Sequence, residues 1–172
     1  MVLFNGRPLA IPELNDKASA ILEAWFPGTE GAAAVGDVLL GDLFPSGRLT
    51  MSFPYAVGQC PLYYNCYNTG RPAKDVYVSA RFSSRYIDGP SVSLYPFGYG
   101  LTYTQFEYGE ISLSQDRMGR DEKVIASCTL KNVGIRKGTE TVQLYLPDMF
   151  GSRVRPVNIS SLTRILLPYQ EG

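Results

Sequence analysis

The sequence predicts an α/β segment followed by an all-β segment, with a long loop rich in aromatic residues between them. Three observations support this prediction. Apolar residues recur at helical spacing in the first third of the chain, and tyrosines without a sustained period crowd its middle. In the last third, apolar and polar residues alternate as they do in half-buried strands. We expect two domains, at residues 1–106 and 107–172 of the 172-residue chain.

Two helices and a short strand are expected in the first segment. The apolar stripe of the first helix consists of Leu14, Ala18, Ile21, Leu22 and Trp25. These spacings are typical of an amphipathic helix, and Pro27-Gly28 would end it. The second helix is expected to begin after Thr29 as its N-cap and to end near Gly41. A turn at residues 45–47 then leads into a short strand, Leu49–Phe53.

The aromatic-rich loop runs from about residue 55 to residue 106. Nine tyrosines lie in it, interleaved with glycine, proline, asparagine and arginine. Aromatic rings beside such polar groups are how proteins hold sugars, because a ring packs on the C–H face while polar groups bind the hydroxyls. The same tyrosines could instead pack the loop against neighbouring domains. The residue pattern alone favours packing over sugar binding.

Strand signals dominate the second segment. Residues 124–131 alternate between apolar and polar, Asn132-Val133-Gly134 predicts a turn, and further strands are expected at residues 142–146 and 162–167. Short strands at this spacing are typical of immunoglobulin-like or fibronectin-like sandwiches, which need ~100 residues and about seven strands. The segment at 107–172 is shorter than that, so we expect an incomplete sandwich.

Composition excludes several classes of function. The 16 basic and 16 acidic residues give a net charge of zero, which argues against a nucleic-acid-binding surface. The chain has no histidine, so it offers no histidine general base, no Ser-His-Asp or Cys-His system and none of the usual zinc or non-haem iron sites. The three cysteines fit no metal spacing, and no apolar run reaches the length of a membrane span. We therefore expect no cofactor, metal, nucleic acid or membrane, and any chemistry must use carboxylates, tyrosines or lysines.

A series of short motifs follows in order along the chain. They are Asn5-Gly6-Arg7-Pro8-Leu9, Glu23-Ala24-Trp25-Phe26-Pro27-Gly28-Thr29-Glu30-Gly31, Gly41-Asp42, Pro45-Ser46-Gly47-Arg48-Leu49, Asn68-Thr69-Gly70-Arg71-Pro72, Ser84-Arg85-Tyr86-Ile87-Asp88 and Leu94-Tyr95-Pro96-Phe97-Gly98-Tyr99-Gly100-Leu101-Thr102-Tyr103. The series resembles the C-terminal part of glycoside hydrolase family 3, in particular its bacterial periplasmic-type β-glucosidases. Residues 138–145 and Arg155-Pro156 resemble the fibronectin type III-like module of that family.

The resemblance implies a three-part parent enzyme, with a barrel domain, an (α/β)6 sandwich domain and a fibronectin type III-like module. This chain would contain the C-terminal part of the (α/β)6 sandwich, the aromatic-rich loop and a truncated fibronectin type III-like β-sandwich. Family members are retaining, exo-acting hydrolases of β-linked glucose that use an Asp nucleophile and a Glu acid/base. Both positions are expected to precede Met1. We therefore assign no catalytic residue to this chain and expect it to be inactive alone.

The expected contribution of this chain is to substrate binding. Arg71, Arg85 and Tyr86 are the candidate residues, at the rim of the sugar site. The expected partners are a β-glucoside or oligosaccharide substrate and the missing N-terminal domains. Two alternatives stay open, namely a non-catalytic carbohydrate-binding or interaction module and a β-xylosidase parent. The resemblance indicates a bacterial protein, but whether it is cytoplasmic or periplasmic is left open, as is its oligomeric state.

Overall fold

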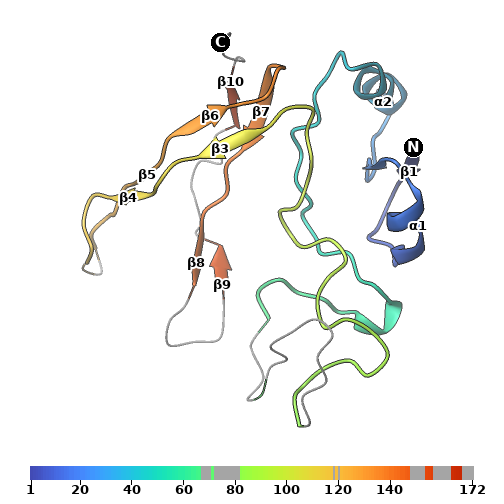
Figure 1. The fold of residues 1–172 in the computed structure, drawn as a ribbon, viewed down its shortest axis with the longest axis horizontal. Coiled ribbons are helices and arrows are strands. Elements are labelled where there is room, and N and C mark those ends of the chain that lie inside the picture. Colours follow the sequence, from blue (N-terminus) through green and yellow to red (C-terminus); the bar gives the residue numbers. More distant parts are fainter. Residues whose placement is uncertain are drawn as a thin grey trace. The chain divides into compact units, whose positions relative to one another are not determined.

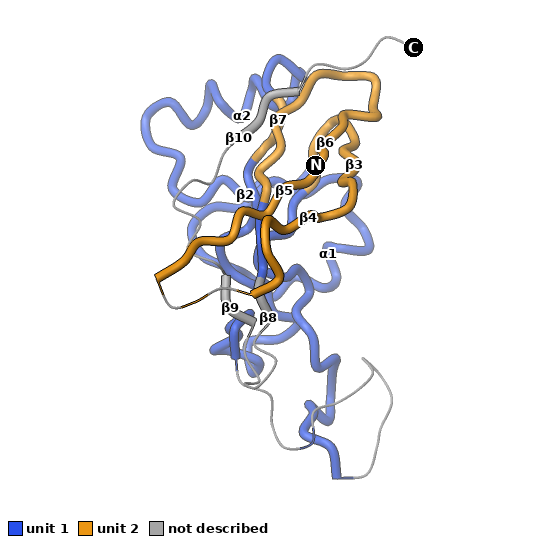
Figure 2. The backbone as a smooth tube through the Cα atoms, turned by 90° about the vertical axis from the view of Figure 1, so that its left-hand side faces the viewer, with its two compact units in different colours: residues 1–43, 47–100, 143–162 blue, residues 44–46, 101–142, 163–172 orange. Residues whose placement is uncertain are grey.

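A computed structural model describes residues 1–66, 71, 82–117, 119, 121–147, 154–156 and 164–167 (Figure 1). The chain divides into two compact units (Figure 2). Unit 1 consists of residues 1–43, 47–100 and 143–162, and unit 2 of residues 44–46, 101–142 and 163–172. Small sheets and a few helices make up unit 1, and the described elements of unit 2 are all short strands. No helix in the described part of the chain is long and apolar enough to cross a membrane.

Unit 1 begins with a β-α-β arrangement. Strand β1 (Val2–Phe4) pairs in parallel with strand β2 (Ile21–Glu23), and the short helix α1 (Pro12–Lys17) lies in the connection between them. Parallel strands need such a crossover because the chain must return to the same end of the sheet. A proline stands in the first turn of α1, where its missing N–H costs no hydrogen bond.

The predicted first helix is wrong in its second half. Helix α1 ends at Lys17, and Ala18 is already extended, with ψ at 129°. Ile21 and Leu22, which complete the helical spacing in the sequence, instead pair with β1. Trp25 adopts a left-handed φ of 51°. A short apolar run is compatible with a helix or with a strand. Here the pairing with β1 stabilises the strand.

The second helix, α2 (Gly31–Leu40), lies where the sequence predicts it. Its N-cap is Glu30, one residue after the expected Thr29. Gly41 ends the helix as predicted, with a left-handed φ of 85°, and its N–H donates to the carbonyl oxygens of Asp37 and Val38 at 3.0 and 3.3 Å. Glycine suits this position because it has no Cβ to clash in the left-handed conformation.

The strand predicted at Leu49–Phe53 does not form as a regular strand; these residues lie in an irregular antiparallel ribbon with residues 94–99. The ribbon is hydrogen-bonded at both ends but forms a single β-bridge, between Phe53 and Tyr95. Phe53 donates to the Tyr95 carbonyl and accepts from the Leu94 N–H, both at 2.8 Å. At the other end, Leu49 makes the equivalent pair of bonds with residues 99 and 98, at 2.8 and 2.7 Å. The ribbon thereby closes the long loop at its base.

Between the two segments of the ribbon, the described residues contain one element, the 3-10 turn η1 (Val57–Gln59). Unit 1 also includes the antiparallel pair of β8 (Tyr145–Pro147) and β9 (Val154–Pro156). The aromatic-rich segment is thus largely irregular where it is described. Side-chain contacts, rather than a continuous ladder, are what hold it in place.

Unit 2 contains pairs of short antiparallel strands. Strand β3 (Phe106–Tyr108) pairs with β6 (Leu130–Asn132), β4 (Ser112–Leu113) with β5 (Ala126–Ser127), and β7 (Gly138–Thr141) with β10 (Arg164–Leu167). The strand expected at 124–131 is therefore divided into β5 and β6, and that expected at 142–146 begins only at β8. The fibronectin-like sandwich and the domain boundary near Phe106 stay predictions.

A buried asparagine organises the turn after β6, as the sequence predicts. Asn132 is 3% exposed, and its Oδ1 accepts from the Thr104 hydroxyl at 2.7 Å and from the Gly134 N–H at 3.1 Å. Its Nδ2 donates to the Arg136 carbonyl at 2.8 Å. Asparagine favours turns because its short side chain bonds to nearby backbone groups.

Candidate functional site

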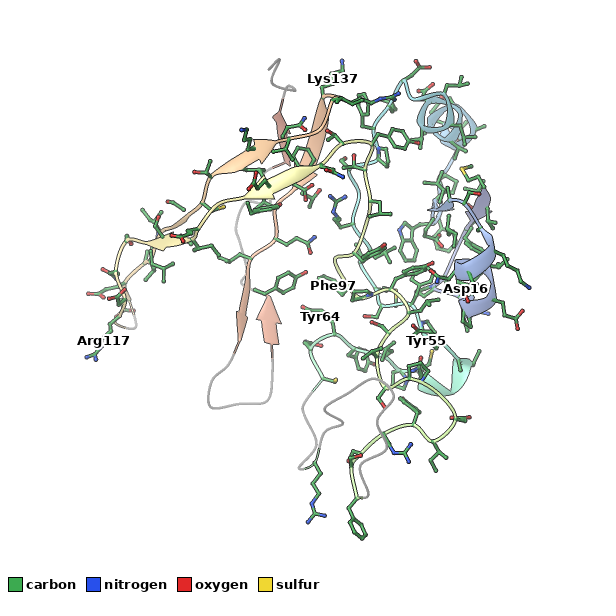
Figure 3. The ribbon with its side chains drawn as sticks, in the orientation of Figure 1. Asp16, Tyr55, Tyr64, Phe97, Arg117 and Lys137 are labelled. Carbon is green, nitrogen blue, oxygen red and sulfur yellow. The ribbon has the colours of Figure 1, made fainter. Side chains whose placement is uncertain are left out.

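Residues 95–99 of unit 1 place aromatic rings in two clusters. Strict alternation would put Tyr95, Phe97 and Tyr99 on one side of an extended chain, but a turn, in which the Tyr99 N–H donates to the Pro96 carbonyl at 3.1 Å, interrupts the extended conformation. The Tyr95 and Tyr99 rings stack with centroids 5.4 Å apart. Phe97 stacks on Tyr64, with centroids 4.1 Å apart and an interplanar angle of 18° (Figure 3). The tyrosine-rich motif therefore takes part in two separate ring contacts.

On the Tyr95 side, the rings continue into the core of unit 1. Phe53 is 2% exposed and meets Trp25 and Tyr95 edge to face, at centroid distances of 6.3 and 5.9 Å. The Tyr95 hydroxyl donates to Asn15 Oδ1 at 2.7 Å. Burial raises the pKa of Tyr95, and electrostatic interactions with Tyr99, Asp16 and Tyr55 raise it further. This tyrosine therefore stays protonated and structural at neutral pH.

On the Phe97 side, strand β8 contacts the ribbon. The Tyr145 ring meets Phe97 edge to face at 6.5 Å, and the Tyr145 hydroxyl donates to Gln143 Oε1. Gln143 Nε2 in turn donates to the Gly98 carbonyl at 3.0 Å. Burial raises the pKa of Tyr145, with a smaller contribution from Tyr64. Gly98 has a φ of +80°, and a Cβ there would come within 2.5 Å of the Tyr145 hydroxyl oxygen.

The structure brings the backbone of the three predicted site residues together. The Ser84 N–H donates to the Arg71 carbonyl at 2.7 Å, so Arg71 lies beside the chain that continues into Arg85 and Tyr86. Arg71 and Arg85 are exposed, and Tyr86 is 38% exposed. The backbone of Arg71 thus lies beside the segment that carries Arg85 and Tyr86, at the surface of unit 1. Such residues can donate hydrogen bonds to hydroxyls and present a ring face to a sugar.

Local hydrogen bonds shape this loop. Arg85 Nη1 donates to the Tyr86 carbonyl at 3.4 Å, and the Tyr86 N–H donates to Ser91 Oγ at 3.2 Å. The Tyr86 hydroxyl reaches across the loop and donates to the Gln59 carbonyl at 3.3 Å. Tyr86 is therefore held at both its backbone and its side-chain end.

Sequence reasoning did not identify Gln59, the buried residue on which the loop is anchored. Its side chain is 4% exposed. Oε1 accepts from the N–H groups of Tyr55 and Ala56 at 2.6 and 3.4 Å, and Nε2 donates to the carbonyls of Pro90 and Val92 at 2.7 and 3.3 Å. A glutamine in a loop carries no periodic signal, and two of its partners lie more than 30 residues further along the chain.

Carboxylates and thiols form no metal-binding cluster in the part of the chain that the structure describes. No group of three histidine, cysteine, aspartate or glutamate residues there could hold a metal ion. Cys60, Cys66 and Cys128 are exposed and free. Glu23 has a local role instead, since its Oε1 accepts from the Trp25 N–H at 2.8 Å and supports the left-handed residue.

Comparisons with known proteins agree on one family. A family model described as the glycosyl hydrolase family 3 C-terminal domain matches residues 1–103. The chain is 50% identical over 157 residues to a periplasmic β-glucosidase of Salmonella typhimurium, covering 91% of this chain and 20% of the relative. It is 39% identical over 152 residues to a β-xylosidase of Formosa agariphila, covering 88% of this chain and 20% of that protein.

Solved structures point the same way. The chain is similar to a β-glucosidase of Listeria innocua, solved in complex with isofagomine, with a TM-score of 0.86 and 39% sequence identity. That match covers 98% of this chain and 24% of the Listeria chain. The chain thus spans about a fifth of the length of the curated relatives it matches. The predicted resemblance is confirmed, and the chain belongs to glycoside hydrolase family 3, as a C-terminal part related to β-glucosidases.

Proposed function

We propose that this chain is part of a retaining, exo-acting β-glucosidase that releases terminal non-reducing β-D-glucosyl residues. The observation that carries the proposal is the 50% identity to a periplasmic β-glucosidase across 91% of the chain. The absence of histidine is compatible with this chemistry, because retaining hydrolysis requires two carboxyl groups and no imidazole.

In this proposal, the Asp nucleophile and the Glu acid/base are supplied by the parts of the enzyme that precede Met1. Residues 1–106 belong to its (α/β)6 sandwich domain and residues 107–172 to its fibronectin type III-like module. The acidic residues of the present chain have other uses where their contacts are known, as with Glu23 and the Trp25 N–H. This chain alone is accordingly inactive.

The present chain contributes the rim of the sugar site through Arg71, Arg85 and Tyr86. The guanidinium groups donate hydrogen bonds to sugar hydroxyls, and the tyrosine ring packs against a C–H face. The hydrogen bond between Ser84 and Arg71 supports this assignment because it keeps the three residues in one loop region. A substrate-bound structure with all three residues out of contact with the sugar would contradict it.

Activity measurements test the catalytic part of the proposal. A chromogenic β-glucoside is offered to this chain alone and to the same chain preceded by the barrel and first sandwich segments of the parent enzyme. We expect hydrolysis with retention of configuration by the longer protein and none by the chain alone. Activity of the chain alone would show that its own carboxylates suffice, and inversion would exclude the double-displacement mechanism.

A β-xylosidase parent is the second candidate, because a relative named putative β-xylosidase is 36% identical to the chain and one named β-xylosidase is 39% identical. The ratio of kcat/KM values for matched glucoside and xyloside substrates decides between them. A non-catalytic carbohydrate-binding module is the remaining alternative. Direct titration of sugars into the chain alone would favour the module if binding were millimolar or tighter.

A further inference from the structure

Gln59 uses every hydrogen-bonding group it has. An amide side chain offers two lone pairs and two donors, and all four are occupied, by Tyr55, Ala56, Pro90 and Val92. Its own backbone is used as well, since its N–H donates to the Ala56 carbonyl and its carbonyl accepts from the Tyr86 hydroxyl. A buried polar group with complete partners specifies one arrangement of the chain around it.

These partners belong to three pieces of the loop. Tyr55 and Ala56 form the turn that enters η1, Tyr86 follows Arg85, and Pro90 and Val92 lead back into the ribbon. The four side-chain bonds join the first piece to the third. The Tyr86 hydroxyl joins the second piece to the same residue. Removing the donors of the Gln59 amide would therefore release Pro90 and Val92 from the start of the loop and leave, among these contacts, only the bond from the Tyr86 hydroxyl to the Gln59 backbone.

We propose that Gln59 is a positioning residue, which holds the loop at residues 84–92 so that Arg85 and Tyr86 are presented in one fixed orientation. This inference rests on the proposed function of Arg85 and Tyr86 in sugar binding. Gln59 itself is buried and touches no substrate. Its contribution is preorganisation, because a loop already held in its binding conformation loses less conformational freedom when the sugar binds.

The same contacts specify how Tyr86 acts. Its hydroxyl proton is donated to the Gln59 carbonyl, so Tyr86 offers a ligand its ring face rather than a hydrogen-bond donor. Arg85 remains the hydrogen-bond donor of the pair. Tyr86→Phe should accordingly loosen the loop without removing a direct hydrogen bond to the sugar.

Hydrogen exchange on the intact chain tests the positioning role. Gln59→Glu has the same shape and keeps the acceptor for Tyr55 and Ala56, but at neutral pH it cannot donate to Pro90 and Val92. We expect the amides of Ser84 and Tyr86 to exchange at least about tenfold faster in the variant. At low pH the new carboxyl is protonated and regains one hydrogen-bond donor. The difference in amide exchange rate between the variant and the parent chain should therefore become smaller.

The matched control is Gln143→Glu, which makes the same chemical change against the Gly98 carbonyl in the same unit. It should leave exchange at Ser84 and Tyr86 unchanged. Tyr86→Phe provides a second, milder variant, with a few-fold faster exchange at residues 84–92 expected. Unchanged exchange at these amides in both Gln59→Glu and Tyr86→Phe would overturn the proposal.

Kinetics on the full-length enzyme separate this inference from the function on which it rests. If both are correct, Gln59→Glu raises KM for the glucoside several-fold and leaves kcat close to that of the parent enzyme. Faster exchange with an unchanged KM would keep Gln59 as the anchor of the loop and remove Arg85 and Tyr86 from the sugar site. A fall in kcat with no change in exchange would contradict the positioning role.

Discussion

Units 1 and 2 are held together by different kinds of interaction. In unit 1, the described part of the aromatic-rich segment has little regular structure, and rings and a buried glutamine fix its conformation. In unit 2, pairs of short strands provide most of the framework, and apolar side chains in or next to them, such as Ile111, Leu113 and Ile125, are exposed. Side-chain contacts can therefore define the conformation of an irregular segment that has no continuous ladder.

Phe53→Ala is expected to have the largest effect, and it should act on unit 1. Phe53 is fully enclosed between the Trp25 and Tyr95 rings, and truncating a buried phenylalanine costs about 3–5 kcal/mol of unfolding free energy. Fluorescence of Trp25, the one tryptophan in the sequence, during denaturant unfolding measures the change in this unit.

Phe26→Ala is the control for that experiment, because Phe26 is 86% exposed. Its effect should stay within about 0.5 kcal/mol. If Phe53→Ala destabilised unit 1 no more than Phe26→Ala, the ring cluster would not be the core of unit 1. Contacts other than the aromatic rings would then have to stabilise unit 1.

Asn132→Ala is the corresponding test of unit 2. It removes a buried side chain that bonds to Thr104, Gly134 and Arg136, and leaves their polar groups without these partners. A loss of about 2–3 kcal/mol is expected, seen as faster amide exchange in β3 and β6 with β1 and β2 unaffected. Lys131→Ala, at the exposed neighbouring position, is the control. Equal exchange in the two variants would show that the turn is held by its backbone alone.

Gly98→Ala tests how closely the ribbon approaches β8. The left-handed φ of +80° costs an alanine roughly 1–2 kcal/mol, and the added Cβ would crowd the Tyr145 hydroxyl. We expect a loss of about 2 kcal/mol in thermal or denaturant unfolding of unit 1. Gly36→Ala, inside α2 with no atom within 4 Å of the added Cβ, should instead stabilise by up to about 1 kcal/mol. If both substitutions changed the unfolding free energy in the same direction, the close approach of the ribbon to β8 would not explain the effect at Gly98.

Part of the fold could be predicted because it depends on local chemistry. The left-handed cap at Gly41 and the Asn132 turn follow from glycine and asparagine acting on their own neighbours in the chain. The error at residues 18–25 has the opposite origin. The spacing of Ile21 and Leu22 is compatible with a helix, but in the folded chain they pair with β1 in a parallel sheet. The local sequence pattern cannot predict this pairing, because the two strands are separated by a crossover connection.

The candidate site shows the same division. Arg71, Arg85 and Tyr86 were chosen because the motifs around them resemble a family, and the contact between Ser84 and Arg71 that joins them is not visible in the sequence. Gln59 carried no signal at all. Its importance comes from burial and from four partners in distant pieces of the loop, which only the folded chain brings together.

The smallest expected effect is a pH dependence that belongs to unit 1 alone. Burial raises the pKa of Tyr95 and of Tyr145 in the folded chain, so folding favours their protonated forms. Their contribution to stability is complete below the pKa of an unfolded tyrosine, about 10. This contribution is lost as the pH rises from the pKa of the unfolded tyrosines through their higher pKa values in the folded chain, because in that range the unfolded chain releases protons that the folded chain retains. Unit 1 should therefore lose stability above about pH 10, as Trp25 fluorescence would report.

Tyr145→Phe should reduce that loss, since phenylalanine keeps the ring beside Phe97 and has no proton to release. Both tyrosines are partly exposed, so solvent screens the effect and a shift of a few degrees in the alkaline Tm is the most that is expected. Tyr108→Phe in unit 2 is the control and should leave the alkaline behaviour of unit 1 unchanged. An equal response to both substitutions would mean that the ring contacts of unit 1 do not set its sensitivity to alkali.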